Sequence, residues 1–398
     1  MKNDREYYGK AYRIIRLVRY LVLVILVLFT VFSMAIYKND ITFDNFRYLM
    51  RYVEFTSPGS STGDGNISFS AGSDDNFVMV DGALAKTTKK DIITYDMNGK
   101  KLLSENFSLQ NPVTVENGNY VLLYDFGGTS LSLYNSFSCV FEKKFPNGID
   151  YAYLSDDGSF ALITSEKNYS GGVVAYDNNF KHVFTFMHPA SRVTDVCFNG
   201  KSGLLACATT DVQNGKFLSE ILVFDTKSLA EEVKSTTHIT GELPLNMFCA
   251  GENFAVMTDK GIHIFDDDCN NVSFCDFGYD TPCAVYRFDN SFAVCLKSAV
   301  ASTDTKLVLY SYSGNVIMEQ AFSSEISHVA KKGDRLFILD PSRLSIYDMS
   351  DDQVPLVLEH SHDGRYKKVF PNGSERYILV SSSGSEGFPI NRQTSENT

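Results

Sequence analysis

The stretch DIITYDMNGKKLL, residues 91–103, decides the fold. A short apolar run ends in an aromatic residue and an acid, a glycine-containing turn follows, and apolar residues then return. Alone, this pattern indicates a β-hairpin. The pattern occurs seven times, as DIITYD, SLSLYN, GVVAYD, EILVFD, GIHIFD, KLVLYS and RLSIYD, with the aromatic residue at Tyr95, Tyr134, Tyr176, Phe224, Phe265, Tyr310 and Tyr347.

The seven aromatic residues are spaced 39, 42, 48, 41, 45 and 37 residues apart. A period of about 40–45 residues with four short strands per unit is typical of a β-propeller blade. Both faces of the motif strand are largely apolar, as a blade packed between two neighbours requires. The acid Asp96 is replaced by Asn135 or Ser311 in other copies. We therefore interpret the acid as a turn former and Tyr95 as a residue that packs between blades.

The ends of the repeat region determine the blade count. RYKKVF (365–370) and ERYILVSS (375–382) resemble the first two strands of a further unit, and NISFS (66–70) is a strand without a blade. Joining these segments would close the ring and remove its open edges. The sequence thus predicts an all-β fold, a β-propeller of about eight four-stranded blades over residues 66–384, whose eighth, composite blade has three strands. Seven blades are the alternative, and 385–398 is predicted to be a disordered tail.

The N-terminal region predicts a membrane anchor. Residues 1–19 carry six basic and two acidic side chains, and the next eighteen residues, 20–37, contain no charge. This length is close to the ~20 residues that cross a bilayer, so we predict a transmembrane helix from Tyr20 to Tyr37 with a cytoplasmic basic tail before it. A cleavable signal peptide ending near SMA (33–35) is the alternative. Residues 38–65 are predicted to form a helical neck and a linker.

Charge and cysteine content restrict the partners. The chain has 36 Lys and Arg and 48 Asp and Glu, and removal of the 6 and 2 within residues 1–37 leaves a net charge of −16. Such a surface repels nucleic acid, so no nucleic-acid partner is predicted. The eight cysteines include no C-x-x-C pair, and most lie in apolar strand-like runs as small buried residues. Two pairs, Cys197 with Cys207 and Cys283 with Cys295, are expected on adjacent strands. These are the pairs to test for disulfide bonds if the compartment is oxidising.

The layout resembles a known family. NPVTVENGNYVLLYDFGGTSLSLYN (111–135), DNFRYLMRY (44–52) and the YDMNGK-type hairpins are similar to those of a family of unknown function, and the resemblance spans almost the whole chain. It implies single-pass, membrane-anchored β-propeller proteins of Gram-positive, mainly anaerobic bacteria. The repeats are more distantly similar to quinoprotein-like and outer-membrane-assembly propellers, although quinoprotein repeats rely on Trp, which this chain lacks. The resemblance implies no activity.

No motif predicts a catalytic residue, a metal ion or a cofactor. The acidic runs at 266–268 and at 156–157 are interpreted as hairpin turns, because neither has the ligand spacing of a calcium loop. His360 and His362 lie two residues apart but lack further ligands for zinc, and His263 is expected to be packed inside a strand.

Loop length points to one face of the propeller. The loops between strands two and three and those between blades emerge on the same face, and three of the former are long, at 165–172, 210–219 and 298–305. Because binding residues often lie on long loops over a rigid scaffold, we predict a binding face there. Its candidate contacts are Tyr169, Arg192, Phe217 and Tyr279.

These observations predict a non-enzymatic protein-interaction or scaffolding module at the cell envelope. The cell membrane would hold it by a single pass, with the N-terminus cytoplasmic and the propeller extracytoplasmic. Two alternatives remain: a sensor of a small ligand or cell-wall fragment, and an envelope hydrolase with a site at the mouth of the propeller channel.

Overall fold

The computed structural model describes residues 19, 20, 22, 23, 25, 63–228, 232–300, 304–351 and 353–390. The chain divides into two compact units, Met1–Phe55 and Thr56–Thr398. In the first, the five described residues are helical and exposed. Among the described residues, no helix is long and apolar enough to span a bilayer. Most of the predicted transmembrane segment 20–37, including Tyr37, and nearly all of 38–65 lie outside the described residues.

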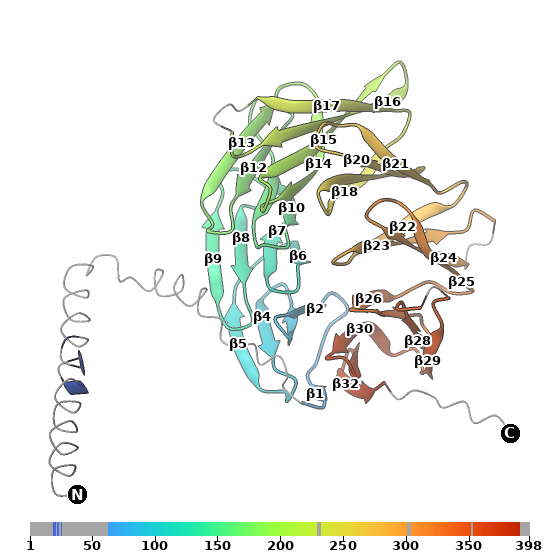
Figure 1. Ribbon diagram of the computed structural model, residues 1–398. Helices are drawn as coiled ribbons and strands as arrows, with labels where there is room; N and C mark the ends of the chain where they lie inside the picture. Colours follow the sequence, from blue (N-terminus) through green and yellow to red (C-terminus); the bar gives the residue numbers. More distant parts are fainter. Residues whose placement is uncertain are drawn as a thin grey trace, which may run out of the picture. The chain divides into compact units, whose positions relative to one another are not determined.

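The second unit is a ring of eight four-stranded antiparallel sheets, each formed largely from consecutive strands (Figure 1). The eight-bladed prediction is thereby confirmed. The first four blades contain β2 (Asn76–Val80), β3 (Ala83–Thr87), β4 (Asp91–Tyr95) and β5 (Lys101–Asn106); β6 (Pro112–Glu116), β7 (Val121–Asp125), β8 (Ser130–Tyr134) and β9 (Cys139–Lys144); β10 (Ile149–Leu154), β11 (Phe160–Thr164), β12 (Gly171–Tyr176) and β13 (His182–His188); and β14 (Arg192–Asn199), β15 (Leu204–Gln213), β16 (Lys216–Asp225) and β17 (Val233–Thr240).

The remaining blades continue the same order. Blades 5 to 7 contain β18 (Pro244–Ala250), β19 (Asn253–Thr258), β20 (Gly261–Phe265) and β21 (Asn271–Asp276); β22 (Thr281–Arg287), β23 (Ser291–Lys297), β24 (Thr305–Ser311) and β25 (Val316–Phe322); and β26 (His328–Lys332), β27 (Arg335–Leu339), β28 (Arg343–Asp348) and β29 (Leu356–Ser361). Blade 8 is composite and consists of β30 (Tyr366–Asn372), β31 (Arg376–Ser381), β32 (Gly384–Pro389) and, from the other end of the propeller, β1 (Ile67–Ser68).

The repeated motif forms the third strand of a blade and the turn into the fourth. In the first copy, Oδ1 of Asp96 accepts hydrogen bonds from the backbone N–H groups of Asn98 (2.9 Å) and Lys100 (2.8 Å). Gly99 follows with a φ of 80°, which glycine adopts without strain. Ser311 accepts the equivalent bond from Asn315 through its hydroxyl oxygen (3.1 Å). The interpretation of the acid as a turn former is confirmed, and the residue types that replace it are those that can accept the same bond.

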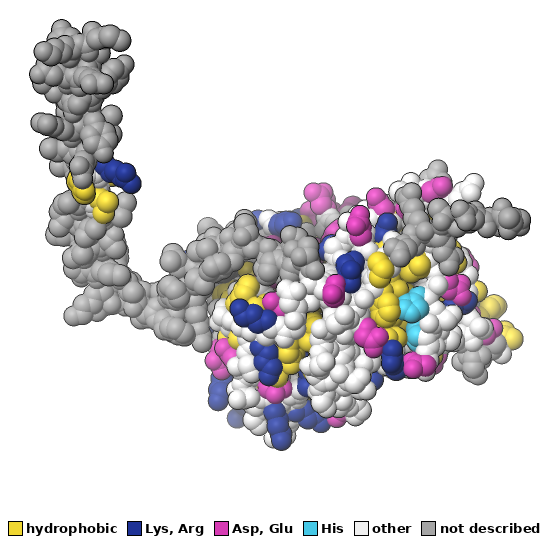
Figure 2. Space-filling model, turned by 90° about the horizontal axis from the view of Figure 1, so that it is seen from below, with side chains coloured by type: hydrophobic (Ala, Val, Ile, Leu, Met, Phe, Trp, Pro, Cys, Tyr) yellow, Lys and Arg dark blue, Asp and Glu magenta, His cyan; other side chains and the backbone are white. Residues whose placement is uncertain are grey.

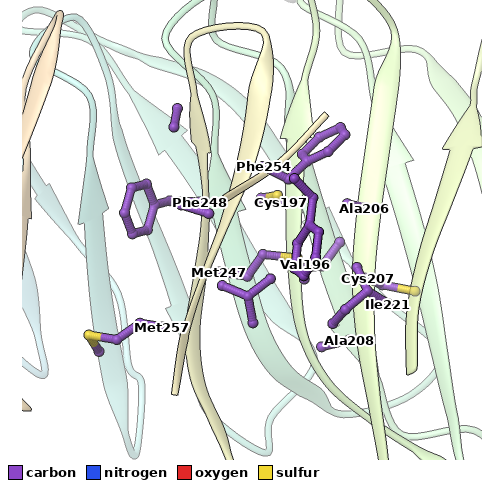
Figure 3. Packing of buried hydrophobic residues seen from close by; sticks show 14 of the residues in the cluster. Val196, Cys197, Ala206, Cys207, Ala208, Ile221, Met247, Phe248, Phe254 and Met257 are labelled. Carbon is purple, nitrogen blue, oxygen red and sulfur yellow. The ribbon is translucent and has the colours of Figure 1, made fainter. Parts of the chain in front are cut away.

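Hydrophobic cores fill the spaces between successive blades. Tyr95 is buried in a cluster that joins β2–β4 to β31, where it packs with Ile378 and Val380. Similar clusters join blades 1 and 2, 2 and 3, 6 and 7, and 7 and 8, and one large cluster runs through blades 3 to 6. Figure 3 shows how side chains of blade 4, such as Val196, lie beside Met247 of blade 5. Both faces of each blade are therefore buried, as the pattern predicts.

The composite blade corrects two details of the prediction. It has four strands rather than three, because Gly384–Pro389 forms β32 and pairs with β1 at Ile67↔Ser385. The predicted tail from 385 is therefore wrong over its first residues. The segment GSEGFP lacks the apolar alternation of a strand because the backbone of 64–65 passes unusually close. A Cβ on Gly387 would lie 1.6 Å from the carbonyl oxygen of Asp64, so only glycine fits.

Candidate functional site

All four predicted contact residues are exposed on one face of the propeller. Tyr169 lies between β11 and β12, Arg192 begins β14, Phe217 is in β16, and Tyr279 lies between β21 and β22. Because the strands of each blade alternate in direction, these connections emerge at the same ends of the sheets. We call this side the loop face, and Tyr279 is its most exposed member at 94%. Their role in binding stays a prediction.

The longest predicted loop is a two-stranded arm. Strands β15 and β16 pair continuously from Leu204↔Asp225 to Gln213↔Lys216, and the neighbouring strands pair only up to Thr210 and Leu218. The turn at 214–215 has two positive φ angles, 53° and 76°, which match a type I′ hairpin. The tip therefore extends past the blade, as the light green hairpin in Figure 1 shows.

The arm carries an unburied apolar pair. Val212 and Phe217 lie directly opposite each other in the ladder and so share one face of the arm. Val212 is 59% and Phe217 41% exposed. Half of the exposed large hydrophobic residues of the described propeller lie on the loop face: Phe126, Tyr169, Val212, Phe217, Leu245, Tyr279 and Val300. The other half lie elsewhere, several of them at the starts of fourth strands, so the projecting pair on the arm distinguishes the loop face and the number of exposed apolar residues does not.

The opposite face leads into a central cavity of about 860 Å³. The first strands of the blades form its wall, and the turns between first and second strands form its mouth. Those turns come from blades 1, 2, 3, 6, 7 and 8, and none of the four predicted contact residues lines the cavity. A cavity of this size holds a small molecule. The structure therefore contains two separate candidate sites. The sequence predicted contact residues only for the loop face and gave a site at the channel mouth as an alternative, without residues.

Arg287, the last residue of β22, faces this cavity. Its Nη1 donates a hydrogen bond to the hydroxyl oxygen of Tyr153 (2.6 Å), and its Cζ lies 4.7 Å from the centre of the Tyr153 ring. The same hydroxyl oxygen accepts a hydrogen bond from the backbone N–H of Cys249 (3.2 Å). Blades 3, 5 and 6 thus meet at one tyrosine hydroxyl, and the guanidinium is held in a defined orientation.

Asp195 is buried beside this cluster, in β14. Burial raises the pKa of its carboxyl to about 7, although hydrogen bonds from the backbone of Val196 and Met247 and from Tyr151, together with the charge of Arg287, act in the opposite direction. The bond from Val196 N to Oδ1 is 2.7 Å long. A carboxyl group with this pKa is partly protonated at neutral pH and can donate as well as accept a hydrogen bond.

Glu116 lines the cavity, and the charge of Lys368 acts on it. Lys368 donates to Oδ1 of Asn76 and to the carbonyl oxygen of Phe77, both at 2.9 Å, and burial lowers its pKa. Glu116 contacts solvent in the cavity, yet the surrounding chain raises its pKa. The charges of Arg287 and Lys368 both act on Glu116 to lower that pKa. Glu116 therefore lies within the electric field of two cations.

Asp266–Asp268 and two of the histidine candidates are bonded within the protein, and Asp156 of the other acidic run lines the central cavity. Asp266 accepts turn hydrogen bonds, and Asp267 and Asp268 form ion pairs with Lys234 at 2.5 and 3.2 Å. His263 is hydrogen-bonded to Glu242 at 2.9 Å, in agreement with the prediction that it is packed and bonded. His360 bonds the hydroxyl of Tyr377 at 2.7 Å. Within the described part of the chain, no three His, Cys, Asp or Glu side chains are placed to hold a metal ion.

The cysteines are thiols, and six of the eight are buried. Cys207 pairs with Val196 in the β14–β15 ladder, and Cys197 pairs with Ala206, so the predicted pair lies on opposite faces of the blade. Cys197 is close to Cys249 of the next blade instead, and burial raises its pKa strongly. Cys283 does approach Cys295, since its Sγ lies 3.2 Å from the Cys295 carbonyl oxygen.

Charges of both signs are mixed on one side of the molecule (Figure 2). On the side of the molecule that Figure 2 shows, acidic and basic side chains are interspersed, with hydrophobic patches between them. Nucleic-acid binding needs Lys and Arg gathered along one groove or stripe. The mixed surface on this side agrees with the net negative charge of the chain.

Sequence reasoning missed the cavity residues, although a signal was present. First strands line the channel, and they contain Tyr151, Tyr153 and Arg287 at positions that line the cavity. Charged and hydroxyl side chains within strands that otherwise lie between blades indicate a wet interior. The exact partners lie too far apart in sequence to be predicted, since Arg287 and Tyr153 are 134 residues apart.

Residues 61–387 match the profile of a family of unknown function, DUF5711. The chain belongs to this family. The match includes all of the first 31 strands, so the family is defined by the propeller itself. No curated protein matches the sequence.

Solved structures similar to the chain are also propellers or parts of propeller enzymes. A eukaryotic initiation factor is 11% identical, with a TM-score of 0.55 over 82% of this chain and 88% of that chain. The quinohemoprotein alcohol dehydrogenase ADHIIG of Pseudomonas putida HK5 is 9% identical, with a TM-score of 0.52 over 81% and 73%. BamB from Moraxella catarrhalis is 11% identical, with a TM-score of 0.48 over 80% and 95%. At these identities a likeness shows the fold alone.

Proposed function

We propose that this protein is a non-enzymatic protein-binding module whose propeller is presented outside the cytoplasm on a single membrane-spanning helix. The observation that carries the binding role is the exposed Val212–Phe217 pair on the projecting arm. A β-ribbon that extends from a rigid ring loses little entropy when it binds, because the ring already orders its base. Tyr169, Arg192 and Tyr279 would form the surrounding contact surface.

The arm is supported by the ring but does not stabilise it. Residues 211–217 form ladder pairs only within the arm, the carbonyl oxygen of Phe217 accepts a hydrogen bond from the N–H of Gly241 (2.8 Å), and none of their side chains belongs to a core cluster. A partner that covers Val212 and Phe217 would remove their apolar surface from water, which is the main source of affinity at the centre of protein interfaces. The arm thus has the features expected of a binding element.

Site-specific photo-crosslinking in the cells that produce the protein tests this role. A photoreactive residue at position 217 should crosslink a discrete partner, and the V212S/F217S double variant should reduce recovery of that partner at least about tenfold. The matched control is position 137, since Phe137 is 37% exposed but lies in the β8–β9 turn on the opposite face. Equal crosslinking from both positions, or none from 217, would contradict the proposal.

The membrane anchor rests on the eighteen uncharged residues after a basic tail. The membrane anchor can be tested by adding a protease to cells whose cell wall has been removed and whose cell membrane is intact. The propeller should be cleaved or labelled from outside, while a tag before residue 19 should stay protected. Protection of both parts would refute the extracytoplasmic placement without bearing on the arm.

A further inference from the structure

The guanidinium of Arg287 has no ionic partner in the described structure. No carboxylate oxygen of the described residues lies within 4 Å of its nitrogens, whereas Arg343 and Arg365 each form ion pairs. The hydrogen bond to Tyr153 satisfies one of the five N–H donors that a guanidinium carries. The group remains charged at every physiological pH, so a positive charge faces the cavity permanently.

Withdrawal of an unpaired charge from bulk water is costly unless another group compensates it. Asp195 is a buried carboxyl on which the charge of Arg287 acts, but burial raises its pKa to about 7, so it is only partly charged at neutral pH. Glu116 feels Arg287 but forms no ion pair with it. Asp156, which also lines the cavity, acts on Arg287 through its charge but forms no ion pair with it. The cation at the cavity wall therefore has no carboxylate of the described residues in direct contact with it.

We propose that the central cavity is a binding site for a small anion, a carboxylate or a phosphate, which Arg287 anchors. A guanidinium binds either group through two parallel N–H···O bonds, and the ring of Tyr153 already holds its plane in place. Lys331 and Lys332 line the mouth together with Asp156, Asp289 and Glu375, so charges of both signs are present there and the guanidinium of Arg287 provides the anion-selective contact. The tyrosine and valine side chains along the wall would contact the body of an organic anion.

This site is independent of the protein-binding face. The cavity opens at the turns between first and second strands, and the arm lies at the other ends of the sheets. The V212S/F217S variant should therefore bind anions as the unmodified protein does. Partner recovery therefore tests the protein-binding role of the arm, and anion binding tests the cavity site, so either proposal can fail without the other.

Isothermal titration calorimetry on the full-length chain, with inorganic phosphate and with citrate as probes, tests the site. We expect at least one probe to bind with a Kd of about 1 mM or below. R287Q should weaken that binding at least about tenfold, and R287K, which keeps the charge but not the paired donors, should show an intermediate loss. The matched control is R365Q, because Arg365 is exposed and lies on the loop face.

A second measurement keeps the test decisive if R287Q fails to fold. Cys249 lines the cavity and is half-buried, whereas Cys283 is exposed and does not line it. Saturating probe should slow alkylation of Cys249 at least about threefold in the unmodified protein and leave Cys283 unchanged, as read by peptide mass spectrometry. Binding of phosphate alone, citrate alone or both identifies the group that is recognised. The proposal is overturned if neither probe binds, if R287Q binds like the unmodified protein, or if Cys249 is not protected.

Discussion

Asp195, which is buried, and His328, which is half-buried at the cavity wall, are titratable side chains whose effects on stability oppose each other. Burial raises the pKa of Asp195 from 3.8 to about 7, so between these values the folded protein holds a proton that the unfolded chain has lost. That contribution to stability falls as pH rises through this window. Burial also lowers the pKa of His328 from 6.5 to about 3, so its contribution rises with pH between about 3 and 6.5. The two dependences largely cancel.

Replacement of Asp195 by Asn should leave the pH dependence of stability that His328 causes without the opposing contribution of Asp195. Asn resembles the protonated acid, so D195N removes the dependence that falls with pH. The free energy of unfolding of D195N, relative to the unmodified protein, should increase by up to about 1.4 kcal/mol per pH unit between pH 4 and 7 and then stay level. Urea unfolding at four pH values measures this. D211N is the control, since Asp211 bonds its following N–H at the same 2.7 Å but is exposed; parallel curves for D195N and the unmodified protein would contradict the prediction.

Among the elements, β32 determines whether the ring closes. It contributes few apolar side chains. Backbone pairing with β1 and two hydrogen bonds to the N-terminal segment join it to the start of the propeller. The hydroxyl of Ser385 donates to the carbonyl oxygen of Gly65 (2.8 Å), and the N–H of Gly387 donates to Oδ1 of Asn66 (3.1 Å). These contacts require the two backbones to approach more closely than any Cβ allows.

G387A should therefore separate β32 from the N-terminal segment. The new methyl group would overlap the Asp64 carbonyl, so the strand must shift, and we expect a loss of at least about 2 kcal/mol in the free energy of unfolding. G72A is the matched control, because a Cβ there meets only Asp75 at 3.6 Å, an ordinary contact. Chemical unfolding of both variants decides the matter, and equal stabilities would show that the close approach is not required.

The same elements show how far the sequence predicts the structure. The seven motif strands, their turns and the residue Tyr95 follow from local periodicity, because each blade repeats the same chemical requirement. Strand β32 was missed because its residues are selected for backbone approach and not for burial. The cavity cluster was missed because Arg287, Tyr153 and Asp195 meet only after the register and order of three blades are fixed. The exposure of Phe217 and Tyr279 agrees with the predicted face, but partner identity is not encoded in either residue.

At the scale of the whole molecule, the ring is closed, so every blade has a neighbouring blade on each side. Each blade packs against two others through a continuous series of cores. Loss of one blade interface would expose two apolar sheet faces at once. Stability is therefore a property of the ring as a whole more than of any blade.

A chain that ends at residue 383 should lose this closure. It lacks β32, so β1 has no partner and β31 becomes an open edge. We expect a thermal midpoint lower by on the order of 5 °C or more, together with aggregation detected by size-exclusion chromatography. A chain that ends at 390 keeps every described strand and should behave as the full chain does. Identical melting of the two shortened chains would show that β32 does not close the ring.

The pairing of β1 with β32 also affects biosynthesis. The two strands are separated by 317 residues, from Ile67 to Gly384. At a translation rate of about 5–20 residues per second, roughly 15–60 s pass between the emergence of the first and the last of them. During that interval the nascent chain carries completed blades with uncovered apolar faces. Ring closure thus has to wait for the synthesis of β32, and a chain whose translation stops before codon 384 cannot form the closed propeller.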